Sequence, residues 1–306
     1  ITIKQKGLIV FLIAVINFLL ILFYQKFLPT NLIKKRIFDF RMFLNPIDRG
    51  ISRTLILFGV RELDHKKILE LVLKKKMKIF DLGANIGYYV LMESSIVGKN
   101  GKIIAIEPVP ENMKLLKKNL ELNKNNITTT MQVGISNLIE EKNFLLSEHS
   151  NLGHIIDDKH SKNYKNKKKI KIQTISLNKL IKKTLFPDFI RMDVEGYEEY
   201  ILKDLINLKL KKYPIICFET HLSKYKKMKD VLKKLFNKGY RIKYASSSSE
   251  SGSLKLKNLG YKPIFKNIKT DDVTREIFKN IKKNHSIKLI CELGGLRTVL
   301  MVCDDR

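Results

Sequence analysis

The longest uninterrupted apolar stretch of the chain lies near its start. Residues 7–24 read GLIVFLIAVINFLLILFY, and Asn17 is the one strongly polar side chain among them. As a helix rising about 1.5 Å per residue, the stretch covers roughly 27 Å, close to the hydrocarbon core of a bilayer at about 30 Å. We expect a transmembrane anchor over residues 1–24, with a cleaved signal peptide and a buried core helix as the alternatives.

Basic residues are unevenly placed around this stretch. Lys4 and Lys6 precede it, whereas a larger group follows it closely: Lys26, Lys34, Lys35, Arg36 and Arg41. Cytoplasmic flanks of membrane helices carry the excess of lysine and arginine. The sequence therefore predicts a single-pass membrane protein with everything after the anchor on the cytoplasmic side.

The hydrophobic pattern changes near residue 75. Residues 25–75 favour a helical lead-in, with Ile68, Leu71 and Val72 at helical spacing. Residues 76–306 alternate short β-rich runs with helix-length amphipathic segments, which indicates parallel strands joined by crossovers. We expect a Rossmann-like α/β domain with a seven-stranded doubly wound sheet. Its strands are predicted at 78–81, 102–107, 128–133, 189–193, 215–219, 241–244 and 298–303.

Two polar stretches interrupt the alternation. Residues 147–169 are basic and contain three histidines without a fixed ligand spacing, and residues 245–253 read ASSSSESGS. Both are predicted to be surface loops. No metal site is expected from them, because no cysteine accompanies the histidines.

The formal net charge of +29 raises the question of a polyanionic partner. Lysines are spread along the chain and do not gather with aromatic residues in one module, so no specific nucleic-acid partner is expected. Cys217, Cys291 and Cys303 lie far apart and predict neither a disulfide framework nor a zinc ribbon.

A glycine-containing turn follows the first predicted strand. Asp81 ends the strand, and Gly83 and Gly87 allow a tight turn and a close approach of helix and ligand. An acid at this position would repel a pyrophosphate but suits the ammonium and sulfonium groups of S-adenosylmethionine. The remaining residues of the turn expected to bind this cofactor are Ala84, Asn85 and Tyr88.

The second predicted strand also ends in an acid. Glu107, followed by Pro108, stands 24 positions after Gly83. A carboxylate at this point of a doubly wound sheet can accept hydrogen bonds from both hydroxyls of a ribose. Both residues are therefore expected at the cofactor site.

The chain resembles the FkbM family of methyltransferases over roughly residues 42–245. The resemblance rests on four motifs that stand here as DLGANIG (81–87), IEP (106–108), DVEGYE (193–198) and FETH (218–221). It implies the class I methyltransferase fold, S-adenosylmethionine as donor, and transfer to a hydroxyl of a sugar, polyketide or similar product. Arg191 departs from the lysine common in the family, and a lysine-type base is thereby excluded.

Four polar residues are expected on the acceptor side of the site: Asp193, Glu195, Glu219 and His221. Asp193 and Glu195 share one face at the end of a strand, and the other two follow the next strand. One of them, Asp193 or His221, is expected to act as the base. Glu195 has a second interpretation as a helix cap, and His221 as a structural histidine; a divalent ion held by the four is a further alternative.

The expected function is an O-methyltransferase acting at a membrane on a sugar, glycolipid or secondary metabolite. Its partner would be a small-molecule, glycan or lipid-linked acceptor. A nucleic-acid methyltransferase and a non-catalytic, membrane-bound binding module remain as alternatives.

Overall fold

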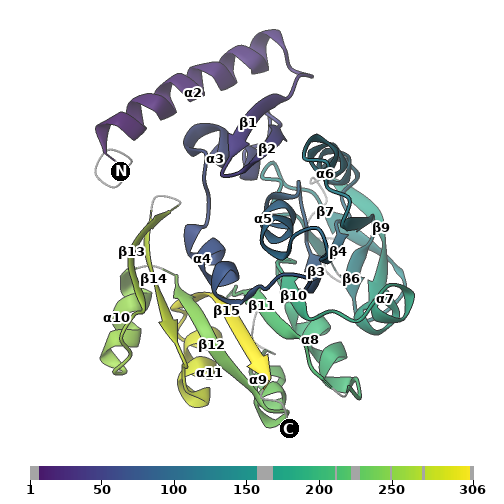
Figure 1. Cartoon of the computed structure of the whole chain (residues 1–306), viewed down its shortest axis with the longest axis vertical. Coiled ribbons are helices and arrows are strands. Elements are labelled where there is room, and N and C mark those ends of the chain that lie inside the picture. The colour runs from purple at the N-terminus through teal and green to yellow at the C-terminus, as the bar shows by residue number, and fades with distance from the viewer. Residues whose placement is uncertain are drawn as a thin grey trace.

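A mixed nine-stranded sheet forms the centre of the protein (Figure 1). The computed structural model describes residues 7–156, 168–210, 212–221, 228–248, 250–270 and 273–303. Across this sheet the strands run in the order β13 (Phe265–Thr270), β14 (Val273–Lys279), β12 (Tyr240–Ser247), β15 (Leu296–Cys303), β11 (Ile215–Glu219), β10 (Phe189–Met192), β3 (Lys78–Leu82), β4 (Lys102–Ile106) and β5 (Thr128–Met131).

All seven predicted strands belong to this sheet, but the prediction of seven strands in total is wrong. Strands β5, β4, β3, β10 and β11 pair in parallel, whereas β15 is antiparallel to both β11 and β12. The two strands that the sequence pattern did not predict, β13 and β14, extend the sheet beyond β12. Their sequences, FKNIKT and VTREIFK, mix apolar and charged residues, which is typical of edge strands and gives a weak hydrophobic signal.

Helices cover both faces of the sheet because its strands are apolar on both sides. Alternate residues of β3 show this, since Ile79 packs in one core and Phe80 in the other. The first core includes side chains of α4 (Leu63–Val72), α5 (Tyr88–Val97) and α6 (Pro110–Leu122). The second includes side chains of α7 (Leu177–Lys183), α8 (Glu198–Asn207), α9 (Met228–Asn237), α10 (Glu250–Asn258) and α11 (Lys283–Cys291).

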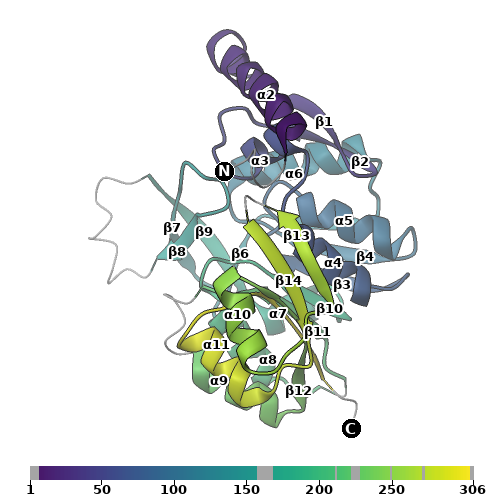
Figure 2. The same cartoon turned by 90° about the vertical axis from the view of Figure 1, so that its left-hand side faces the viewer.

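A small four-stranded sheet lies between β5 and α7 in the chain and projects to one side (Figure 2). Its order is β6 (Gly134–Ser136), β9 (Lys169–Ser176), β7 (Glu141–Leu145) and β8 (His154–Ile156). The predicted loop 147–169 is therefore partly strand, and its residues 157–167 lie outside the described part. The prediction of a loop at residues 245–253 is wrong for most of that range. Its first three residues end β12, with Ser246 and Ser247 fully buried, and α10 begins at Glu250.

The N-terminal region differs from the predicted helical lead-in. Helix α2 (Leu8–Phe27) is followed by a hairpin of β1 (Ile33–Ile37) and β2 (Phe40–Leu44), and only then by α3 (Ile51–Phe58) and α4. The hairpin is held on α6, because Asn119 and Asn123 accept hydrogen bonds from the backbone of Phe43 and Arg41 at 2.7 and 2.9 Å. By length and composition α2 can cross a membrane, and a signal sequence has the same features.

Candidate cofactor and acceptor site

The turn after β3 is pressed against the end of β10. Gly83 has a φ of +87°, and a Cβ on it would stand 2.1 Å from the carbonyl oxygen of Asp193. The amides of Gly83 and Ala84 both donate to the carbonyl of Ile106, at 3.0 and 2.9 Å. Glycine is required at this point by the positive φ and by the close approach of the backbone. The turn is thus locked between the carboxyl ends of β10 and β4.

The carboxylate of Glu107 joins the turn after β3 to the turn after β4. Its Oε2 accepts from the amide of Asn85 at 2.9 Å, and its Oε1 accepts from the amide of Val109 at 2.9 Å and from Asn112 Nδ2 at 3.3 Å. Burial raises the pKa of Glu107 to about 7, although these hydrogen bonds act in the opposite direction. A carboxylate has about four lone-pair sites, so Oε2 keeps capacity for a ligand hydroxyl.

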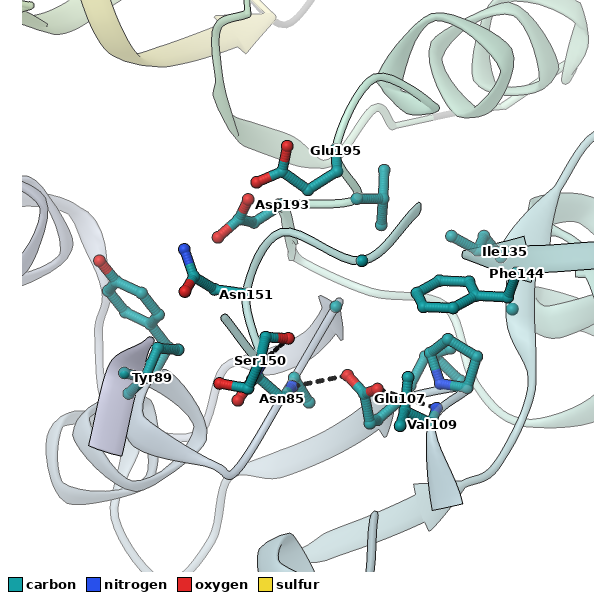
Figure 3. Close-up of a pocket in the computed structure, with 18 of the residues that line it drawn as sticks. Asn85, Tyr89, Glu107, Val109, Ile135, Phe144, Ser150, Asn151, Asp193 and Glu195 are labelled. Carbon is teal, nitrogen blue, oxygen red and sulfur yellow. Dashed lines mark hydrogen bonds between the residues drawn. The ribbon is translucent and has the colours of Figure 1, made fainter. Parts of the chain in front are cut away.

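A cleft opens at the carboxyl ends of β3, β4 and β10 (Figure 3). Its empty space, which includes open solvent at the mouth, is about 720 Å³. Eight predicted site residues line it: Gly83, Ala84, Asn85, Tyr88, Glu107, Pro108, Asp193 and Glu195. The structure therefore brings most of the predicted donor residues together with two of the predicted acceptor residues.

Asp81 does not line this cleft, so its predicted contact with the cofactor's ammonium group is not what the structure shows. The side chain is fully buried, and its Oδ1 accepts a hydrogen bond from Arg191 Nη1 at 2.8 Å. The reason is the sheet register, which places Arg191 directly beside Asp81 on the neighbouring strand. Gly87 is also absent from the lining; at φ +91° it begins α5, and a Cβ there would stand 2.6 Å from Leu116 Cδ1.

Arg191 links the buried Asp81 to Asp193 at the cleft. Its Nη2 donates to Asp193 Oδ2 at 3.0 Å, and its guanidinium lies 3.8 Å from the centre of the Tyr89 ring. The side chain is 1% exposed and lines the cleft. An arginine in this position stays charged and orients the Asp193 carboxylate, which is a positioning role and not that of a base.

Glu195 projects into the cleft from a turn that another residue stabilises. Glu195 has a φ of +52°, and the fully buried Glu198 accepts hydrogen bonds from the amides of Val194 and Gly196 at 3.0 and 2.9 Å. Burial raises the pKa of Glu198, with His221 acting in the opposite direction. Glu198, at the first position of α8, thus stabilises the turn that precedes the helix.

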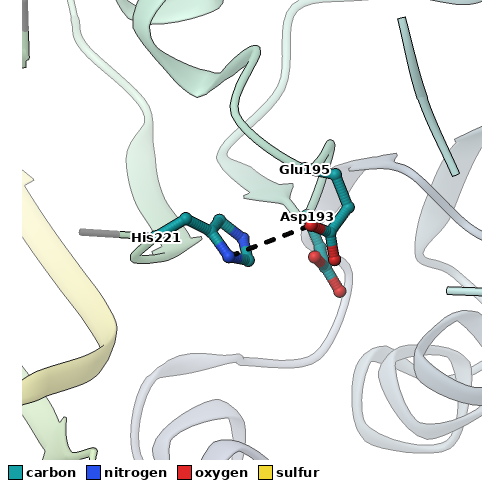
Figure 4. A group of neighbouring side chains, drawn as sticks. All are labelled: Asp193, Glu195 and His221. Carbon is teal, nitrogen blue, oxygen red and sulfur yellow. Dashed lines mark ion pairs between the residues drawn. The ribbon is translucent and has the colours of Figure 1, made fainter. Parts of the chain in front are cut away.

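His221 lies between two carboxylates just after β11. Its Nδ1 is 3.9 Å from Glu195 Oε2 and its Nε2 is 4.0 Å from Glu198 Oε1, and Figure 4 shows the ring facing Glu195 and Asp193. Ligand atoms of Asp193, Glu195 and His221 lie within 4.8 Å of one another. The four predicted acceptor residues are not equivalent: Asp193 and Glu195 line the cleft, whereas His221 and Glu219 are not part of its lining, and Glu219 forms an ion pair with Arg297.

Several lining residues come from a region that the sequence predicted to be a loop. Ser150 and Asn151 extend across the cleft between its donor and acceptor sides (Figure 3), and the Ser150 carbonyl accepts from Asn85 Nδ2 at 2.9 Å. The Asp48 carboxylate also holds Ser150 in place. Its Oδ1 accepts a hydrogen bond from the Ser150 amide and its Oδ2 accepts one from the Ser150 hydroxyl, each at 3.0 Å. No periodicity marks these residues, so only the fold reveals them.

A comparison with known protein families covers the part of the chain that carries most of this site. The methyltransferase FkbM domain model matches residues 81–242, which include every signature motif described above. A protein-L-isoaspartate O-methyltransferase of Methanococcus maripaludis is 35% identical over 72 residues, covering 23% of this chain. The matched region spans about a third (34%) of the length of that curated relative.

Solved methyltransferase structures resemble the chain only distantly. The FkbM methyltransferase of Methylobacillus flagellatus is 16% identical, with a TM-score of 0.39 and coverage of 74% of this chain and 52% of that one. TYW2 of M. jannaschii, solved with AdoMet, is 14% identical, with a TM-score of 0.42 and coverage of 82% and 87%.

The fold, the site and the matched domain together define a methyltransferase whose cofactor is S-adenosylmethionine. The chain belongs to the FkbM family of methyltransferases.

Proposed function

We propose that the chain transfers a methyl group from S-adenosylmethionine to a hydroxyl of a sugar, glycolipid or secondary metabolite at a membrane. The observation that carries the proposal is the placement of His221 beside Glu195 and Asp193, two carboxylates that line the cleft. A hydroxyl acceptor must lose a proton, and an imidazole flanked by carboxylates is suited to take it.

The donor side of the cleft fits the cofactor by the chemistry of its lining. Glu107 would accept a hydrogen bond from the ribose through Oε2, and the Gly83 turn leaves room for close contact with the backbone. Apolar side chains of Ile106, Val109 and Phe144 would pack around the adenine. Bound there, S-adenosylmethionine supplies a methyl group activated by its sulfonium.

The acceptor side would align the nucleophile and remove its proton. Asp193, held by Arg191, would accept a hydrogen bond from the acceptor and orient its hydroxyl oxygen toward the methyl carbon. His221 would take the hydroxyl proton, and Glu195 would stabilise the imidazolium that results. The oxygen–methyl bond forms as the methyl–sulfur bond breaks, and the electron pair of the broken bond stays on sulfur.

A membrane location for this activity is supported by α2 and by the helix that follows it. α3 packs beside α2, while its first residue, Ile51, lines the cleft. The eight residues of α3 span about 12 Å, so an acceptor held at a bilayer surface would be within reach of the site. The basic residues after α2 favour the anionic cytoplasmic leaflet as the surface on which the cleft lies.

Transfer of radiolabelled methyl groups tests the proposal. The full chain would be incubated with labelled S-adenosylmethionine and separate lipid, glycan, RNA and protein fractions, with His221→Ala as the matched control. We expect label in the lipid or glycan fraction with the unmodified chain and not with the variant. Label in RNA would contradict the proposed substrate class, and saturable cofactor binding without transfer to any fraction would favour a binding module.

A further inference from the structure

Helix α2 lies across one end of the molecule and is attached along a single stripe (Figure 1). Ala14 and Ile21 are its buried side chains, and Asn17 lies between them at helical spacing. Asn17 Nδ2 donates to the carbonyl of Leu57 in α3 at 3.1 Å. Near the other end, Gln25 Nε2 donates to the carbonyl of Pro46 at 2.8 Å. The one strongly polar residue of the apolar stretch is thus used to bind the domain.

The rest of the helix circumference is apolar and exposed. Ile9, Ile16 and Phe23, spaced by seven residues on one face, are 75%, 66% and 50% exposed. The same holds for further large side chains of this helix: Leu8, Leu12, Ile13, Leu19, Leu22 and Phe27. A continuous apolar surface of this length marks an interaction site, because soluble surfaces rarely expose one.

This attachment conflicts with the single crossing expected from the sequence. Asn17 stands ten residues before Phe27, about 15 Å along the helix, which is the middle of a bilayer core of about 30 Å. A crossing α2 would bring α3 to the same depth, together with Arg53, whose guanidinium lies 5.4 Å from the centre of the Phe18 ring. A charged side chain at that depth is strongly disfavoured. Docking on α3 and crossing the membrane therefore exclude one another.

The charge around α2 fits an anionic lipid surface. Residues 7–61 contain two acids, Asp39 and Asp48, and Asp48 is engaged by the backbone amides of Gly50 and Ser52. The same span contains the basic residues Lys26, Lys34, Lys35, Arg36, Arg41, Arg49, Arg53 and Arg61, of which Arg49 is paired with Glu148 and Arg61 with Glu62. Basic residues beside an apolar helix attract it to the headgroups of anionic lipids.

We propose that α2 lies in the plane of an anionic bilayer surface, with its outer face among the lipid chains and its inner stripe docked on α3. The helix then anchors the domain to one leaflet without crossing. The proposal sharpens the membrane part of the function proposed above, and its test does not depend on methyl transfer.

The depth of three positions along α2 distinguishes the two arrangements. The chain contains no tryptophan, so Ile9→Trp, Ile16→Trp and Phe23→Trp each introduce a single fluorophore on the outer face. Each variant, in the full chain, would be bound to vesicles of phosphatidylcholine and phosphatidylglycerol carrying bromine at defined acyl positions. An in-plane helix places the three tryptophans at one shallow depth, with equal quenching profiles.

Three results would overturn the proposal. A crossing helix would make Ile16→Trp much deeper than the other two, and absence of quenching in all three would exclude lipid as the partner. Leu254→Trp, at a 59% exposed apolar position of α10, is the matched control and should stay unquenched. Quenching there equal to that on α2 would show adsorption without orientation and would also contradict the proposal. Cofactor affinity of the same variants tests the methyltransferase function separately, because none of these side chains lines the cleft.

Discussion

The donor and acceptor sides of the cleft are built in different ways. On the donor side the main chain determines the shape: the amides of Gly83, Ala84 and Asn85 are all bonded within the site, and Glu107 binds two turns together. On the acceptor side charged side chains face one another, and Arg191 and Glu198 hold them in place. Exchange of a few side chains can therefore change the acceptor while the donor site and the fold remain.

The largest effect is expected from removing the base. His221→Ala should lower turnover by roughly 10²–10⁴-fold, the contribution typical of general base catalysis, and leave cofactor affinity within a few fold. Turnover would be measured on the acceptor fraction that takes up label. Asp193→Asn should behave in the same way if it orients the acceptor. Full activity in both variants would leave positioning alone as the mechanism.

Loss of the Glu107 carboxylate should act on the donor side only. Glu107→Ala is expected to weaken S-adenosylmethionine binding by about 1.5–3 kcal/mol, the cost of losing a charged hydrogen-bond partner. Glu107→Gln keeps the shape of the side chain and should lose less. Calorimetry gives the dissociation constants, and an unchanged value in folded Glu107→Ala would remove Glu107 from the ribose role.

The contact between the two sides can be tested through Gly83. Gly83→Ala places a Cβ against the Asp193 carbonyl in a left-handed conformation, whereas Gly59→Ala has a similar φ of +74° with no atom within 4 Å. Both variants carry the cost of a left-handed residue, about 1–2 kcal/mol. Gly83→Ala should lose about 1–2 kcal/mol more in urea unfolding, because the backbone must also move. Equal losses would show that the close contact is unimportant.

The smallest predicted effect is a pH dependence of donor binding. Burial raises the pKa of Glu107 from 4.5 to about 7, so the carboxyl is protonated below that pH and ionised above it. Ionised Glu107 accepts ribose hydrogen bonds better, and affinity should rise about two- to tenfold from about pH 6 to about pH 8. The same raised pKa lowers the unfolding free energy as pH rises from 4.5 to about 7, since the unfolded carboxyl ionises first. Calorimetry should find a flat profile for Glu107→Gln.

Much of the donor side could be predicted from the sequence, because its residues follow one another on two adjacent strands. Gly83, Asn85 and Glu107 lie where strand-ending motifs of a doubly wound sheet place them. Asp81 carries the same signal, yet it lies buried outside the cleft lining because it pairs with Arg191, 110 residues away in the chain. Local sequence does not encode such a register.

The loop residues of the cleft and the outer strands were less predictable from the sequence. Ser150 is held at the cleft by hydrogen bonds to Asp48, about a hundred residues earlier. Strands β13 and β14 and the β1–β2 hairpin carry charged residues among their apolar ones, which hides the alternation that identifies a half-buried strand; in β14 the charged Arg275 and Glu276 are themselves buried.

Calorimetric titration of S-adenosylmethionine into Glu107→Ala and His221→Ala, measured in parallel with the unmodified chain, tests the division of the cleft most directly. The division predicts that the dissociation constant rises by about 10-fold or more in Glu107→Ala and stays within a few fold in His221→Ala. A loss of affinity in His221→Ala as large as that in Glu107→Ala would contradict it, because His221 would then belong to the donor site.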